Sequence, residues 1–99
     1  MIVIAGTVRV SPEKIDGARP HMEKMLNASR AEAGCISYSY AQDVLDPGLI
    51  HVAEVWESDD ALKLHFESSH MKEWRAAWPS IGISDRNLTR YAVTDATPL

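Results

Sequence analysis

The apolar residues of this chain follow two different periods. Alternation of apolar and polar residues is typical of a strand with one buried face, whereas apolar residues at i, i+3 and i+4 are typical of an amphipathic helix. The pattern predicts strand 2–10, helix 13–33, strand 36–40, strand 50–56, a helical segment 58–82 and strand 87–93. This β-α-β-β-α-β order indicates an α+β protein with a ferredoxin-like fold and a four-stranded antiparallel sheet.

The first helix has a clear start signal and an unusual interior. Ser11 and Pro12 precede an acidic residue, as expected for a capping hydroxyl followed by proline at the first helical position. Gly34 is the predicted C-cap. Pro20 cannot donate a hydrogen bond to the carbonyl of Asp16, so we expect it to kink the helix.

The second helical segment is predicted to be split. Ser58 offers a capping hydroxyl at its start, and Ser68-Ser69 repeats the signal ten residues later. Pro79 and Gly82 are expected to end the segment. The turn 46–48, Asp-Pro-Gly, separates the second and third strands.

The first and third strands are apolar on both faces. Val3 and Ala5 alternate with the apolar residues of the other face, as do Ala53 and Val55. Helices on one side of the sheet would leave the other side in water, where polar residues are expected. The pattern therefore predicts that a second sheet covers this face, in a homodimer.

Composition narrows the functional class. The chain has 99 residues, which predicts one domain, 1–99, with residues 94–99 as a loose tail. A formal net charge of −4 without a basic cluster disfavours nucleic-acid binding. No apolar run approaches the ~20 residues of a membrane helix. Cys35 is the single cysteine, so no internal disulfide forms, which fits a cytoplasmic protein.

The candidate chemistry lies in the second helical segment. Leu62, His65 and Phe66 follow at i, i+3 and i+4, so His65 lies on the apolar stripe. His70 and Trp74 share a face after the break. A histidine on an apolar face is more often a packing residue than a base, so both interpretations stay open at this point.

Aromatic residues of the strands offer a pocket wall. Tyr38 and Tyr40 share a face of the second strand, and Trp56 ends the third. Packing across the sheet explains them as well as a wall for a flat ligand does. Glu54 lies on the same strand face as Trp56 and needs a partner, for which Arg90 and Arg9 are candidates.

No motif predicts a metal or a cofactor. His65 and His70 are five residues apart, whereas two ligands on one helix usually lie four apart. The chain contains no HExxH, CxxC, GxGxxG or P-loop pattern. We therefore expect neither a metal site nor a flavin, nicotinamide or other cofactor.

Two stretches of the chain carry a family resemblance. Residues 54–58 read Glu-x-Trp-x-Ser, with His65 nine residues after the tryptophan and His-Met-Lys at 70–72. Residues 32–38 read Glu-Ala-Gly-Cys-Ile-Ser-Tyr. Both patterns resemble the antibiotic biosynthesis monooxygenase (ABM) superfamily, in particular its small quinol-monooxygenase-like branch.

The resemblance implies a dimeric α/β barrel and a cofactor-independent oxidation by O₂. The implied substrate is a small electron-rich aromatic molecule, a quinol, phenol or anthrone. His65 would then be the base and His70 a second proton-transfer or orienting group. The expected substrate-binding residues are Trp74, Tyr38, Trp56 and Phe66.

Other functions of the same fold stay open. An isomerase acting on a small carbonyl compound would use the same base, with Arg75 as the nearby cation. Haem-degrading relatives carry an asparagine, a tryptophan and a histidine where this chain has Gly6 or Thr7, His65 and Arg75, so haem degradation is disfavoured. A non-catalytic dimer that binds a small ligand is the remaining alternative.

Overall fold

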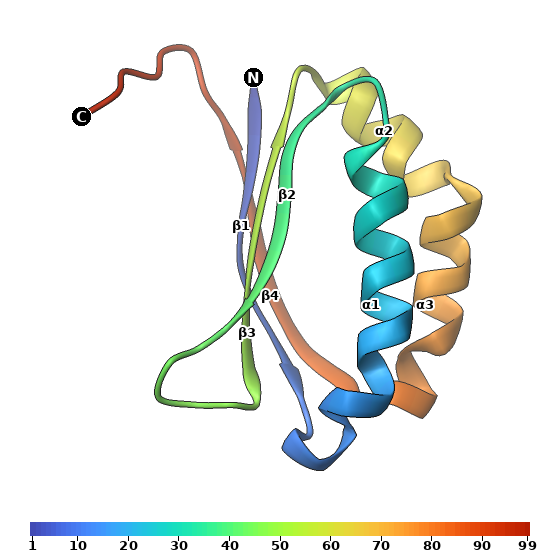
Figure 1. Cartoon of the computed structure of the whole chain (residues 1–99). Coiled ribbons are helices and arrows are strands. Elements are labelled where there is room, and N and C mark those ends of the chain that lie inside the picture. The colour runs from blue at the N-terminus through green and yellow to red at the C-terminus, as the bar shows by residue number, and fades with distance from the viewer.

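The computed structural model describes residues 1–99 and has the predicted ferredoxin-like α+β architecture. In chain order the main elements are β1 (Ile2–Val10), α1 (Ile15–Arg30), β2 (Cys35–Gln42), β3 (Leu49–Trp56), α2 (Asp59–Glu67), α3 (Ser69–Ile81) and β4 (Ile83–Ala92). All neighbouring strands are antiparallel, in the order β2-β3-β1-β4. Figure 1 shows the helices packed on one side of this sheet. None of the helices is long and apolar enough to cross a membrane.

The core lies between the helices and the face of the sheet that they cover. Ile4 and Val8 of β1 point into it, as do Val52 and Trp56 of β3. From the helices, Met25 and Trp74 complete this layer. The alternation in β1 and β3 thus placed their even-numbered residues correctly, because both strands run without interruption through their mutual pairing.

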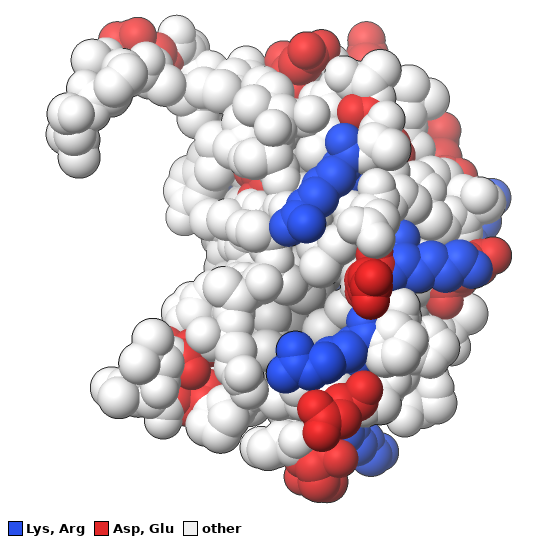
Figure 2. Space-filling model, viewed as in Figure 1, with Lys and Arg blue, Asp and Glu red and all other residues white.

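The opposite face of the sheet is open. Val3 pairs with Val55 on one side and with Tyr91 on the other, and Ala5 pairs with Ala53. These residues are only partly buried or exposed. Figure 2 shows charged side chains gathered on the helical side, whereas the hollowed side beneath the C-terminal tail is largely uncharged.

The ends of the helices differ from the prediction. Pro12–Lys14 form a short 3₁₀ helix, and α1 continues without a break through Pro20. The α-helix ends at Arg30 with Ala31 as its cap, so the prediction of Gly34 as the C-cap was wrong. A Cβ on Gly34 would lie 2.3 Å from the Cβ of Ala61, so a close approach to α2 accounts for this glycine.

The split of the second helical segment and its end at Gly82 are confirmed, whereas Pro79 does not end the helix as expected. The Ser58 hydroxyl accepts a hydrogen bond from the amide of Ala61, and Ser68 caps α3 in the same manner. Pro79 lies inside α3, and Gly82 ends the helix in a left-handed conformation at φ 75°. Proline near the end of a helix removes only one backbone hydrogen bond, which leaves room for this arrangement.

Two strands contain an extra residue that changes which side chains face the core. In β2, Cys35 pairs with Trp56 and Ser37 with Val55, so Ile36 is the extra residue and its side chain is exposed. Strict alternation over the predicted strand 36–40 would place Ile36 on the same face as Tyr38, and the extra residue makes that expectation wrong. In β4 the pairing with β1 shifts around Asp85, whose φ is +50°.

Candidate functional site

A cavity of about 200 Å³ lies between the sheet and helices α2 and α3. Of the six predicted site residues, four line it: His65, Tyr38, Phe66 and Trp74. Trp56 does not reach the cavity but is fully buried behind it, with its ring centroid 4.5 Å from that of His65. His70 lines a different cleft.

His65 is the polar group at the centre of this aromatic wall. Its side chain is 0% exposed, and the rings of Trp56 and Tyr38 lie next to it, at centroid distances of 4.5 Å and 5.3 Å. Its Nδ1 lies 2.7 Å from Oε2 of Glu32. Burial, followed by the charges of His70 and Arg75, lowers the pKa of His65 to about 4. The ring is therefore neutral at neutral pH.

The second ring nitrogen of His65 has no partner. Nε2 is buried and makes no hydrogen bond. A buried nitrogen of this kind normally finds a partner, and an exception in a native fold needs a reason. Because Nδ1 faces Glu32 and the ring lines the cavity, a ligand hydroxyl is a suitable partner for Nε2.

Glu32 was not predicted as a site residue. It follows the end of α1 in the connection to β2, where no periodic pattern marks its direction. Burial raises its pKa to about 7, and the nearby carboxylate of Glu54 adds to the effect. Its other oxygen, Oε1, lies 3.4 Å from Nε2 of His70. The sequence signal was its place in the Glu-Ala-Gly-Cys pattern, which gave no role by itself.

The break between α2 and α3 aims His70 at the same carboxylate. Ser68 ends α2, caps α3 and lies 3.2 Å from Nε2 of His70 through its Oγ. The same hydroxyl donates to the carbonyl of His65 at 2.6 Å. The five-residue spacing of the two histidines therefore brings both rings to Glu32, which an unbroken helix would not do.

Glu32, His65 and His70 also form a group that could hold a metal ion. Their ligand atoms all lie within 4.8 Å of one another. A metal-bound histidine usually donates its other ring N–H to an acceptor. A metal on Nδ1 of His65 would place a proton on Nε2, which has no acceptor. The donor set thus fits a hydrogen-bonded histidine–carboxylate pair better than a metal centre.

A buried carboxylate, Glu54, also lines the cavity. The indole N–H of Trp56 donates to Glu54 at 2.9 Å. Burial raises the pKa of Glu54, although hydrogen bonds from Trp56 and Tyr38 and the charge of Arg86 act in the opposite direction. The predicted partners were wrong, because Arg90 pairs with Asp59 and Arg9 with Asp46.

The cations of the cavity also differ from the prediction. Arg75 donates to the carbonyl of Phe66 and does not line the cavity. Arg86 and Arg90, both on β4, do line it. Arg86 has no carboxylate partner within salt-bridge distance and lies over the ring of Trp78, 4.8 Å from its centroid. It is therefore the cavity cation that is free to face a ligand.

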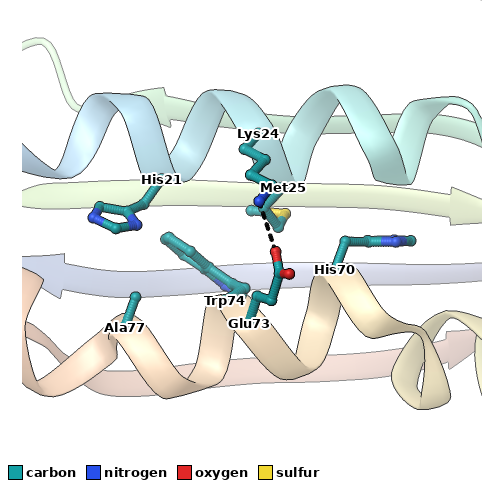
Figure 3. Close-up of a pocket in the computed structure, with 7 residues that line it drawn as sticks. All are labelled: His21, Lys24, Met25, His70, Glu73, Trp74 and Ala77. Carbon is teal, nitrogen blue, oxygen red and sulfur yellow. Dashed lines mark ion pairs between the residues drawn. The ribbon is translucent and has the colours of Figure 1, made fainter.

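A second, more open cleft of about 230 Å³ lies between α1 and α3. Figure 3 shows His21 and Trp74 at one end of it and His70 at the other. Lys24 and Glu73 form an ion pair across the cleft at 2.9 Å, and both side chains are largely exposed. This cleft gives His70 a side that is open to solvent.

Comparison with known proteins identifies the family. Residues 1–77 match the profile of the family described as antibiotic biosynthesis monooxygenase. The chain is 29% identical to the uncharacterized protein sll1783 of Synechocystis over 98 residues, which are 99% of this chain and 67% of that protein. It is also 29% identical over 72 residues to YcnE of Bacillus subtilis, named as a candidate monooxygenase, with coverage of 73% and 76%.

The fold of a solved relative agrees over the whole chain. A crystal structure from Deinococcus radiodurans, described as a candidate antibiotic biosynthesis monooxygenase, superposes with a TM-score of 0.90 at 24% identity. The match covers 100% of this chain and 98% of that one, which establishes the shared fold. With its core elements, its split helix and the profile match over residues 1–77, the chain belongs to the antibiotic biosynthesis monooxygenase family.

Proposed function

We propose that this protein is a cofactor-independent monooxygenase that oxidises a small quinol or phenol with O₂. The observation that carries the proposal is the unpartnered Nε2 of His65, in a ring that lines an aromatic cavity and is held by Glu32. Such a nitrogen can accept the proton of a substrate hydroxyl. Membership of a monooxygenase family supports the reaction class.

The size of the cavity favours a small substrate. An apolar cavity of ~150 Å³ is large enough to bind benzene. The cavity of about 200 Å³ next to His65 therefore suits a molecule of one or two rings better than a three-ring anthrone. Tyr38, Phe66 and Trp74 offer flat apolar surfaces to such a ring.

The reaction needs few protein groups. His65 accepts the hydroxyl proton at Nε2, and the resulting substrate anion transfers one electron to O₂. The substrate radical and superoxide combine at a ring carbon to form a peroxide, which takes up a proton. Loss of water, formed from the outer peroxide oxygen with the hydrogen of that carbon, leaves the quinone. The protein supplies a base, an apolar pocket and a stabilising group for the anion.

Proton transfer from a phenol to His65 alone is unfavourable. A phenol with a pKa near ~10 faces a histidine whose pKa is about 4, and the difference of ~6 units costs ~8 kcal/mol. If the proton is shared with Glu32, whose pKa is about 7, the difference falls to ~3 units, or ~4 kcal/mol. Arg86 is placed to stabilise the phenolate and to reduce the remainder.

We also infer that the protein acts as a homodimer. The open face of the sheet contains a row of paired residues, Val55, Val3 and Tyr91, with no helix over it. Burial of such a face against a second copy removes apolar surface from water. A dimeric α/β barrel, sheet against sheet, agrees with the family to which the chain belongs.

One observation supports the alternative function, an isomerase acting on a small carbonyl compound. Arg86 and Arg90 line the cavity and would suit a substrate with an anionic group. The same base, His65, would then enolise the carbonyl compound. A polar substrate fits the aromatic wall less well, so we place this function second.

The test is an oxygen-electrode screen of quinols, phenols and anthrones with two variants of His65. His65→Ala should reduce kcat/KM by ~10²–10⁴-fold, and His65→Gln should be almost as damaging because glutamine cannot titrate. His51→Gln, at a half-exposed histidine of the inner strand β3 that does not line the cavity, is the matched control and should keep full activity. A His65→Gln variant that turns over at the wild-type rate would exclude His65 as the base, and no oxygen uptake with any substrate would favour a binding protein.

A further inference from the structure

We propose that Glu32 determines which nitrogen of His65 carries the proton, and thereby switches His65 between a form that can accept a proton and one that cannot. The proposal rests on the function of His65 as a base. Its geometric foundation is the 2.7 Å contact between Oε2 of Glu32 and Nδ1 of a fully buried ring. A contact this short holds one proton between the two atoms.

The proton count of the pair gives the two forms. With Glu32 ionised and His65 neutral, the proton lies on Nδ1 and donates to the carboxylate, so Nε2 is bare. One additional proton yields either a carboxylic acid that donates to Nδ1 or an imidazolium beside a carboxylate. Both arrangements place a proton on Nε2, so His65 can no longer accept a proton there. The protonation state of Glu32 thus determines whether Nε2 of His65 carries a proton.

His70 is placed to favour the ionised form of Glu32. The single hydroxyl proton of Ser68 is donated to the carbonyl of His65, so Ser68 Oγ accepts from Nε2–H of His70. That N–H also lies 3.4 Å from Oε1 of Glu32. Glu54 on β3 acts in the opposite sense as a nearby negative charge, the charge of Arg75 on α3 acts on His65, and the Cys35 thiol on β2 interacts with Glu32.

The switching proton has a route from solvent. His70 lines the cleft between α1 and α3 that Figure 3 shows, so its ring joins Glu32 to open solvent. The cavity that would hold the substrate is lined by His65 but by neither Glu32 nor His70. Glu32 can therefore change its protonation state while a ligand occupies the cavity.

Nitrogen NMR of ¹⁵N-histidine-labelled protein tests the proposal without a substrate, because protonated and bare ring nitrogens differ widely in chemical shift. In the wild type, His65 should carry its proton on Nδ1 at high pH and gain one on Nε2 as the pH falls through a single midpoint. One pH unit to either side, the ratio of the two forms should reach about ten to one. Glu32→Gln should abolish this transition.

Three further variants sharpen the test. His70→Phe removes the donor to Glu32 and should move the midpoint to higher pH. Glu32→Asp keeps a carboxylate but draws it away from Nδ1, and should weaken the preference for the Nδ1 proton. Asp43→Asn is the matched control, because Asp43 pairs with His51 at the same 2.7 Å on an exposed edge; it should leave the His65 signals unchanged.

The outcomes separate this proposal from the function of the protein. A transition at the same pH in Glu32→Gln, or one proton position on His65 at every pH in the wild type, would overturn the role of Glu32. An unmoved midpoint in His70→Phe would overturn the role of His70. If the transition occurs as described but His65→Gln keeps full oxygenase activity, the switch stands and the proposed base does not.

Discussion

The rate of substrate oxidation should depend on pH through Glu32 rather than through His65 alone. Burial lowers the pKa of His65 to about 4, so an isolated His65 would be unprotonated across the whole range from pH 5 to pH 8. The rate of an enzyme that depended on His65 alone would then change little between pH 5 and pH 8. The pKa of Glu32 is raised to about 7, and protonation of the pair places a proton on Nε2 of His65, which then cannot act as a base. The rate should therefore rise with pH.

The expected size of this rise follows from the titration of one group. With a pKa of about 7, the active fraction is ~1% at pH 5, ~9% at pH 6, ~50% at pH 7 and ~91% at pH 8. The value of kcat/KM should thus increase by ~90-fold between pH 5 and pH 8. An unshifted histidine with a pKa near ~6.5, as the sequence alone suggests, would give ~30-fold with a midpoint half a unit lower.

The assay is oxygen uptake at substrate concentrations well below KM, in buffers of constant ionic strength. Glu32→Gln is the informative comparison, because it cannot titrate and should flatten the profile between pH 5 and pH 8. Circular dichroism at each pH confirms that the fold is unchanged. A flat wild-type profile, or a Glu32→Gln variant with the same midpoint as the wild type, would refute this reasoning.

Other predictions concern assembly and the backbone. Sedimentation should find a dimer at micromolar concentration, and Val3→Lys with Ala5→Lys should give aggregated or unfolded protein; a stable folded monomer would contradict the dimer. Pro20→Ala should leave the fold intact and change the free energy of unfolding by no more than ~1 kcal/mol in chemical denaturation, because residue 20 is exposed. Gly6→Ala should cost at least ~2 kcal/mol, since φ is +155° and a Cβ would lie 1.9 Å from the carbonyl oxygen of Asn87. Gly17→Ala, in open space on α1, should instead stabilise by ~0.5–1 kcal/mol in the same denaturation assay.

The fold was predictable because its periods are long and uninterrupted in the elements that matter most. The alternation in β1 and β3 placed Ile4 and Val52 in the core, and the spacing of Leu62 and His65 gave the buried side of α2. The sequence failed where one extra residue inverts the alternation, as at Ile36. It also failed at Pro79, because the distance of a proline from the helix end depends on the packing of the last turn.

The site was only half visible in the sequence. His65 could be found because its position on an apolar stripe already predicts burial. Glu32 could not, since it lies 33 residues away in a connection whose direction is set by the packing of α1 against β2. The pairing of Glu54 with Trp56 was missed because we expected the partner on a neighbouring strand. Trp56 lies two residues further along the same strand and on the same face, and its indole N–H donates to Glu54.

The irregularity at Asp85 bears on how the β4 edge of this cavity can vary. Before the extra residue, Ile83 pairs with Val10 of the covered face. After it, Arg86, Leu88 and Arg90 line the cavity. Because β1 leaves this extra residue unpaired, its deletion would keep Ser84 opposite Arg9 and Asn87 opposite Thr7. Arg86 and Arg90 would therefore still face the cavity. Length variation at this position is thus compatible with an unchanged cationic edge, whose charge changes through substitution of the arginines themselves.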